Sequence, residues 1–143
     1  FPMGVAALLE AADLLISGRH QEQAQDESKA SYEGWYHEEE SHIHWANHVD
    51  QVYNLIRACN PAPGAWTVLG GTRVWLYDCR KHPVHGFAGV RGKPGEIAGL
   101  TEAGLLICSH GGQIEVLKLK PEGGAKMNAA DFARERQLLS PPA

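Results

Sequence analysis

The segment with the densest potential for chemistry reads HEEESHIHWANH, over residues 37–48. It brings together four histidines and three glutamates, namely His37, His42, His44, His48, Glu38, Glu39 and Glu40. Imidazole nitrogens and carboxylate oxygens are ligands for zinc. In an extended strand His42 and His44 share one face, whereas His48 lies beyond a helix start, so three convergent ligands require a bend. Because the spacing matches no strong zinc pattern, we assign no metal ligand and keep a histidine-rich metal-binding module as the lesser alternative.

Basic side chains offer a second kind of chemistry, the binding of phosphate. The formal charge of −4 is uneven, since residues 1–50 carry −8 and residues 51–143 carry +4. Seven basic residues on or beside predicted strands are candidate contacts for nucleic acid or a partner: Arg73, Arg80, Lys81, Arg91, Lys93, Lys118 and Lys120. Strand exteriors are charged in most soluble barrels, and these residues are more dispersed than the stripe that tight nucleic-acid binding needs. Binding of nucleic acid is therefore an alternative that we do not prefer.

Composition narrows the class of protein further. The 143 residues suffice for one hydrophobic core. No apolar run approaches the roughly 20 residues that span a bilayer, so no membrane contact is expected. The three cysteines, Cys59, Cys79 and Cys108, are widely spaced and form no C-x-x-C pair. This pattern predicts buried thiols in a reducing cytoplasm.

The elements that must position these side chains begin with a helix predicted over residues 4–17. Apolar residues recur there at steps of three and four on one face: Val5, Leu8, Leu9, Ala12, Leu15 and Ile16. Gly18 ends the helix. Residues 19–41 are polar and have no sustained period, which indicates a linker. The apolar stripe predicts association, either with another domain or between copies of the chain as a homo-oligomer.

Two further helices are predicted on either side of a β-rich region. Asn47 fits an N-cap, with Asp50 in the reciprocal capping position, and the helix that follows runs to about Ala58. Near the other end of the chain, Asn128 fits a second N-cap, with Asp131 three residues later. Helices placed before and after a run of strands are typical of the α+β class.

The region between these helices has the period of two that strands show. Strands are predicted over residues 66–69, 72–79, 97–100, 105–108 and 113–119, and an irregular loop over residues 81–95. The first two strands flank Gly70 and Gly71, a hairpin signal because glycine tolerates the positive φ of primed turns. Several short strands with glycine turns predict a small open β-barrel, similar to an OB-fold, with flanking helices.

Several segments resemble the 10-formyltetrahydrofolate-dependent formyltransferase family. The start of the family's C-terminal domain is resembled by residues 49–67, VDQVYNLIRACNPAPGAWT. The end of that domain is resembled by residues 124–136, GAKMNAADFARER. QDESKASYEG, residues 25–34, resembles the connector between the two domains. The family includes methionyl-tRNA formyltransferase, sugar N-formyltransferases and the hydrolase part of 10-formyltetrahydrofolate dehydrogenase, whose matching segment the opening FPMG resembles.

The resemblance implies a division of the chain into three parts. Residues 1–18 would be the last helix of a missing catalytic domain, residues 19–41 an inter-domain linker and residues 42–140 the C-terminal barrel. The family's catalytic asparagine, histidine and aspartate lie in H-x-S-L-L-P and D-x-G motifs, and neither motif occurs here. We therefore assign no catalytic or cofactor-binding residue, and expect 10-formyltetrahydrofolate to bind in the catalytic domain.

The expected function follows from the same resemblance. The chain would be the non-catalytic C-terminal domain of a formyltransferase or formyl hydrolase, packing on the catalytic domain in cis or in trans and helping to place the substrate. By itself it is expected to be inactive. The alternative is the tRNA-binding barrel of a methionyl-tRNA formyltransferase. The formyl acceptor stays open between water, methionyl-tRNA and an amino sugar.

Overall fold

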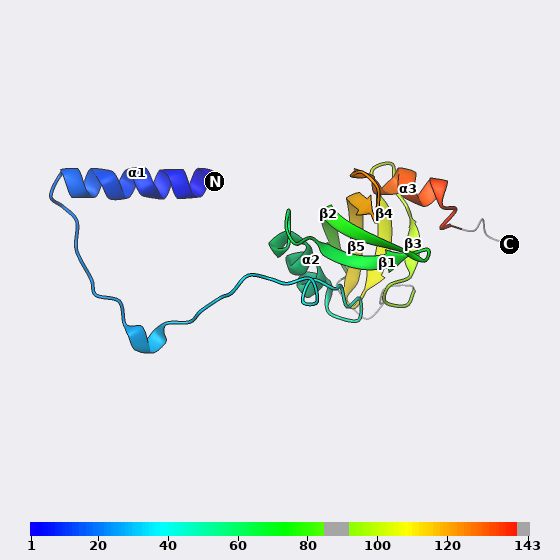
Figure 1. The fold of residues 1–143 in the computed structure, drawn as a ribbon, viewed down its shortest axis with the longest axis horizontal. Coiled ribbons are helices and arrows are strands. Elements are labelled where there is room, and N and C mark those ends of the chain that lie inside the picture. The colour runs from blue at the N-terminus through cyan, green and yellow to red at the C-terminus, as the bar shows by residue number, and fades with distance from the viewer. Residues whose placement is uncertain (85–91, 140–143) are drawn as a thin grey trace. The chain divides into compact units, whose positions relative to one another are not determined.

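The computed structural model of the chain describes residues 1–84 and 92–139. The chain divides into two compact units, Phe1–Gly34 and Trp35–Ala143. The first unit contains helix α1 (Pro2–Ile16) and the short 3-10 helix η1 (Glu27–Lys29). The second unit holds all of the strands described here (Figure 1). The turn after Gly34 belongs to the second unit, because the indole N of Trp66 on the first strand donates to the carbonyl of Glu38.

Helix α1 is apolar on more than one face. The predicted helix is confirmed, but Met3 and Leu14 lie opposite the predicted stripe, on the side that also carries Glu10 and Asp13. None of its residues is buried. Helices that are apolar around much of their circumference are typical of protein interiors. Among the residues described, no helix has the length and apolar character that crossing a membrane requires.

The second unit is built on an antiparallel sheet in the order β1-β2-β5-β4-β3, with β6 paired to β5. The strands are β1 (Ala65–Leu69), β2 (Thr72–Pro83), β3 (Ile97–Leu100), β4 (Leu105–Ser109), β5 (Gly112–Pro121) and β6 (Met127–Asn128). Helices α2 (Val49–Ala58) and α3 (Ala129–Glu135) lie beside the curved sheet (Figure 1). The α+β class and the open barrel are confirmed.

The predicted strands differ from the structure chiefly in the length of β2 and in the absence of β6 from the prediction. Strand β2 continues to Pro83, whereas residues 81–95 were expected to form an irregular loop, because β5 begins at Gly112 and pairs with Pro83. The short strand β6 was not predicted, since a two-residue strand has no period to detect. Residues 85–91 of the predicted loop lie outside the described part of the chain.

Helix α2 starts one residue later than predicted. The N-cap is His48, whose Nδ1 accepts a hydrogen bond from the backbone N of Asp50 at 3.3 Å, while Gln51 Oε1 accepts from His48 N at 3.2 Å. Asn47 instead belongs to the preceding turn, where its backbone N donates to the carbonyl of His44. The prediction of Asn47 and Asp50 as the capping pair is therefore wrong, although the helix itself is confirmed.

The hydrophobic core lies between the sheet, α2 and α3. Helix α2 buries Val49, Val52 and Ile56, and α3 buries Phe132. The strands contribute the other large buried side chains, namely Val74, Leu76, Leu105, Ile107, Ile114, Val116 and Leu119. Burial of such side chains stabilises a domain by roughly 1.5–3 kcal/mol each. The sheet is therefore held by apolar packing on one face, whereas the opposite face carries aromatic and charged side chains such as Trp75 and Lys120.

Residues 41–43 pair with β1, the first strand in the order of the sheet. The backbone N of Ile43 donates to the carbonyl of Trp66 at 2.9 Å, and Trp66 N donates to the carbonyl of Ser41 at 3.0 Å. The indole N of Trp45 donates to Thr67 Oγ1 on the same strand at 3.0 Å. These contacts give the segment before α2 a fixed place along β1.

The same segment also reaches β4 and the turn that follows it. Ser109 Oγ lies within hydrogen-bond distance of two carbonyls, that of Trp45 at 3.1 Å and that of Asn47 at 2.8 Å. The backbone N of Val49 donates to the carbonyl of His110 at 2.7 Å. A Cβ added at Gly95 would lie 3.3 Å from Trp45. Residues 41–49, called the closing segment below, thus join β1 to β4 across the open side of the barrel.

We predict that Ser109→Ala lowers the free energy of unfolding by about 1–2 kcal/mol, because it removes the donor that two carbonyls of the closing segment share. Urea denaturation followed by tryptophan fluorescence measures the change. Ser28→Ala, in the exposed η1 turn, is the matched control and should change stability by less than about 0.5 kcal/mol. Equal effects of the two substitutions would contradict a structural role for Ser109.

Candidate binding surface

Three strands place tryptophan and lysine side chains in one row. Trp66 on β1 lies directly opposite Trp75 on β2, and Trp75 lies opposite Lys120 on β5. Directly opposed residues in antiparallel strands point to the same face of the sheet. This face is the one away from the core, because the alternate residues Val74 and Leu76 are fully buried.

Arg73 completes this surface. Its guanidinium carbon lies 3.9 Å from the ring centre of Trp66 and 4.9 Å from that of Trp75. Cation–π contacts of this kind contribute about 0.5–2 kcal/mol. An ion pair joins Arg73 Nη2 to Glu38. We call Trp66, Arg73, Trp75 and Lys120 the Arg73 surface.

His42 extends the aromatic stack from the closing segment. Its ring centre lies 4.3 Å from that of Trp66 and 4.8 Å from that of His44. Burial lowers the pKa of His42 below its ordinary value of 6.5, and the nearby His44 and Arg73 lower it further. The imidazole of His42 is therefore uncharged at neutral pH, so the positive charge of this surface comes from Arg73 and Lys120.

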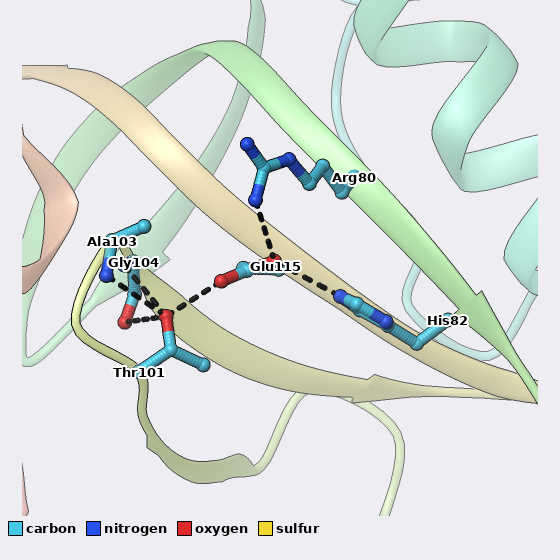
Figure 2. A network of polar contacts seen from close by, with 6 residues as sticks. All are labelled: Arg80, His82, Thr101, Ala103, Gly104 and Glu115. Carbon is cyan, nitrogen blue, oxygen red and sulfur yellow. Dashed lines mark hydrogen bonds and ion pairs between the residues drawn. The ribbon is translucent and has the colours of Figure 1, made fainter.

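A buried carboxylate lies elsewhere on the sheet (Figure 2). Glu115 Oε1 accepts a hydrogen bond from Thr101 Oγ1 at 2.5 Å, and Oε2 lies 3.0 Å from His82 Nε2 and 3.9 Å from Arg80 Nη1. The hydrogen bond from Thr101 holds the pKa of Glu115 below its ordinary value, with further lowering by His82 and Arg80. A Cβ at Gly104 would lie 2.3 Å from the carbonyl of Val116. The hydrogen bond between Thr101 and Glu115 therefore holds the tight turn at residues 101–104 against β5. We call Glu115 with Thr101, His82 and Arg80 the Glu115 cluster.

The structure does not gather the seven predicted basic contacts on one surface. Arg73 and Lys120 share the Arg73 surface, whereas Arg80 faces Glu115. The other candidates are placed separately: Lys81 pairs with Asp50 of α2, Lys93 lies in the turn before β3, Lys118 lines a pocket of about 400 Å³ with Lys126 and Asp131, and Arg91 lies outside the described residues. As contacts for a partner, all seven remain predictions.

The histidine-rich segment does not converge on a metal site. His42 and His44 lie side by side as predicted, but His48 caps α2, where its ring is 6.2 Å from that of His110. Among the residues described, no three histidine, cysteine, aspartate or glutamate side chains are grouped so that they could hold a metal ion. The metal-binding alternative thus gains no support from this geometry.

The three cysteine thiols are shielded from solvent to different degrees. Cys59 and Cys108 are buried, and Cys79 is half-buried. Burial raises the pKa of Cys79 to about 12, with a further contribution from Asp78. A thiolate, and not a thiol, is the nucleophile in cysteine chemistry. Cys79 is therefore unsuited to nucleophilic catalysis at neutral pH.

Sequence reasoning missed both the Glu38 to Arg73 ion pair and the Glu115 cluster. A charged residue at the centre of the strand QIEVLKL was the available signal for Glu115, because a carboxylate between buried neighbours needs partners. Nothing in the local pattern marked Glu38, which is separated from Arg73 by 35 positions. Contacts of that kind depend on the fold and not on the local sequence.

Known proteins share both the sequence and the fold. Residues 37–137 match the family described as formyl transferase, C-terminal domain. The chain is 31% identical over 140 residues to a methionyl-tRNA formyltransferase of Syntrophus aciditrophicus and 35% identical over 131 residues to that of Carboxydothermus hydrogenoformans. These alignments cover 95% and 91% of the chain but only 42% and 41% of the two relatives.

Solved structures give the same picture of the fold. A crystal structure of a HypX variant from Aquifex aeolicus matches with a TM-score of 0.68 and 21% identity, covering 92% of this chain and 24% of that one. HypX in complex with tetrahydrofolic acid matches with the same TM-score, covering 23% of that chain. The chain therefore belongs to the family of formyltransferase C-terminal domains, as its sequence indicated, and spans about two fifths of the length of its curated relatives.

We predict that Glu115→Gln lowers the free energy of unfolding by about 1–2 kcal/mol at pH 7, because hydrogen bonds to a charged group are lost. Because the pKa of Glu115 is lowered in the folded protein, its carboxylate stabilises the fold at pH values above its ordinary pKa of 4.5. This stabilisation is lost as the pH falls through the lowered pKa. Denaturation of both forms between pH 7 and pH 3 should show the difference shrinking in acid.

The matched control for this comparison is Glu102→Gln, an exposed glutamate in the neighbouring turn. It carries the same change of charge without the buried hydrogen bonds, so its effect should stay within about 0.5 kcal/mol. A difference between wild type and Glu115→Gln that does not change with pH would contradict the assignment of a stabilising, ionised carboxylate.

Proposed function

We propose that this chain is the non-catalytic C-terminal domain of a 10-formyltetrahydrofolate-dependent formyltransferase or formyl hydrolase of the cytoplasm. The observation that carries this proposal is the family match over residues 37–137, in a chain that spans about two fifths of methionyl-tRNA formyltransferases. Binding of 10-formyltetrahydrofolate and catalysis then belong to a separate catalytic domain. The chain's own task is to pack on that domain and to help place the substrate.

Helix α1 supports the packing role. Its exposed apolar side chains include Leu8, Leu9, Leu15 and Ile16, and it carries apolar residues on the opposite face as well. Exposed apolar surface of this extent marks an interaction site. A helix that needs cover on more than one side fits into a domain interior better than into a two-helix dimer contact. A catalytic domain, in cis or in trans, is therefore the proposed partner, and self-association is the competing outcome.

Binding of tRNA is a second candidate function, favoured by the Arg73 surface. Aromatic rings give unpaired bases a platform for stacking, and arginine and lysine contact phosphate. Trp66 and Trp75 supply the rings beside Arg73 and Lys120. The two methionyl-tRNA formyltransferases compared above are 31% and 35% identical to this chain, and each alignment covers over nine tenths of it. Under this candidate, the surface would hold tRNA while the catalytic domain acts on the methionyl group.

We predict that the chain alone does not release formate from 10-formyltetrahydrofolate, because the family's catalytic motifs are absent from its sequence. The absorbance change on formation of tetrahydrofolate measures the reaction. A formyltransferase that contains a catalytic domain is the positive control. Turnover that persists through repurification, and that a point substitution within residues 1–143 abolishes, would contradict the assignment of a non-catalytic domain.

We also predict that Leu8→Asp combined with Leu15→Asp weakens association through α1 by at least about tenfold, since burying two apolar side chains contributes roughly 3 kcal/mol. Analytical ultracentrifugation, with and without a separately produced catalytic domain of the family, measures both self-association and heterologous pairing. Gln21→Asp with Gln23→Asp changes the charge equally in the polar linker and should have no effect. A chain that stays monomeric and does not bind the catalytic domain would contradict this role of α1.

A further inference from the structure

The Arg73 surface carries a carboxylate of its own. Glu38, in the turn before the closing segment, forms an ion pair with Arg73 Nη2. The Glu38 side chain is 57% exposed and that of Arg73 is 26% exposed, so the pair stands at the edge of the surface. Arg73 Nε is buried and has no hydrogen-bond partner among the residues described. The guanidinium is thus held in place by two rings and one carboxylate.

The backbone of Glu38 is anchored independently of its carboxylate. Its carbonyl accepts hydrogen bonds from Trp66 Nε1 at 2.8 Å and from Ser41 Oγ at 2.9 Å. His37 N donates to Glu40 Oε2 at 2.9 Å, which closes the same turn. The turn therefore keeps its shape when the Glu38 side chain changes partner. Removing the charge of Glu38 tests the carboxylate without removing the turn.

We propose that the Glu38 carboxylate occupies the position at Arg73 that a phosphate group of RNA takes, and so limits the affinity of the Arg73 surface for RNA. This proposal rests on the second candidate function. Guanidinium groups recognise carboxylate and phosphate with the same hydrogen-bond geometry. Because the Glu38 carboxylate is more than half exposed, its ion pair is weak, and a phosphate displaces it at small cost. The contacts of the guanidinium with the rings of Trp66 and Trp75 then hold Arg73 in place for the phosphate.

The alternative role for Glu38 predicts the opposite sign. If its carboxylate only positioned Arg73, removal of the charge would loosen the guanidinium and weaken binding. If it competes with phosphate, removal strengthens binding. Glu39 separates this effect from a general decrease of negative charge, because it lies in the same turn, is exposed and makes no polar contact among the residues described. Glu38→Gln and Glu39→Gln are therefore a matched pair.

The experiment is a fluorescence titration of the full chain with bulk tRNA at several salt concentrations. Wild type should bind with a dissociation constant near or weaker than about 10⁻⁵ M at physiological salt, the non-specific range. Glu38→Gln should bind about fivefold more tightly, the factor that matches the upper end for an exposed ion pair. Glu39→Gln should change affinity by less than about twofold. Thermal unfolding of each variant verifies that the fold is kept.

Arg73→Gln distinguishes failure of this proposal from failure of the candidate function. It should reduce the slope of log affinity against log salt by about one phosphate contact and abolish the gain from Glu38→Gln when the two are combined. Salt-dependent binding that needs Arg73, with Glu38→Gln equal to Glu39→Gln or weaker than wild type, overturns the competition alone. If neither wild type nor any variant binds tRNA, or if Arg73→Gln leaves the affinity unchanged, both the competition and the candidate function are overturned.

Discussion

The closing segment is the constraint on which the rest of the second unit depends. The sheet of the second unit begins at β1 and ends at β3, and these two strands do not pair with each other. Residues 41–49 bridge the gap. Ile43 and Trp45 of this segment bond to β1, and the segment also bonds to Ser109 of β4, the neighbour of β3, and to His110. The segment also delivers the capping residue His48, so closure of the barrel and the start of α2 are coupled. A short histidine-rich stretch of sequence thus links two separate strands of the sheet.

The closing segment and the turn before it also build the candidate surface. Pairing of Ser41 and Ile43 with Trp66 fixes the direction of the chain, which sets His42 against the Trp66 ring and Glu38 against Arg73. The hydrogen bonds that close the barrel and the contacts that shape the Arg73 surface therefore arise from one stretch of backbone. A substitution in this stretch affects stability and binding together unless it is confined to an exposed side chain such as Glu38.

Local sequence patterns predicted the helices and strands but not the long-range contacts between them. The period of two revealed five of the six strands, and Gly70 and Gly71 marked the hairpin, where both adopt positive φ values of 56° and 76°. In contrast, Ser109 contacts Trp45 across 64 positions, and no local period encodes such a pairing. The capping residue was missed for the same reason, since the bond from Ser109 to the carbonyl of Asn47 ties that residue to the turn before α2. The resemblance to the formyltransferase family supplied the identity of the domain but none of these long-range contacts.

Folding also redistributes the charge asymmetry of the sequence. The acidic first part of the chain supplies Glu38 to Arg73 and Asp50 to Lys81, so part of its negative charge neutralises the basic second part. Within that second part Arg80 faces the buried Glu115. A net charge of +4 over residues 51–143 therefore overstates the positive potential that a polyanion meets. Because close pairs dominate over charges beyond a Debye length of about 8 Å, the potential beside each of these basic side chains depends on its carboxylate partner more than on the net charge of the domain.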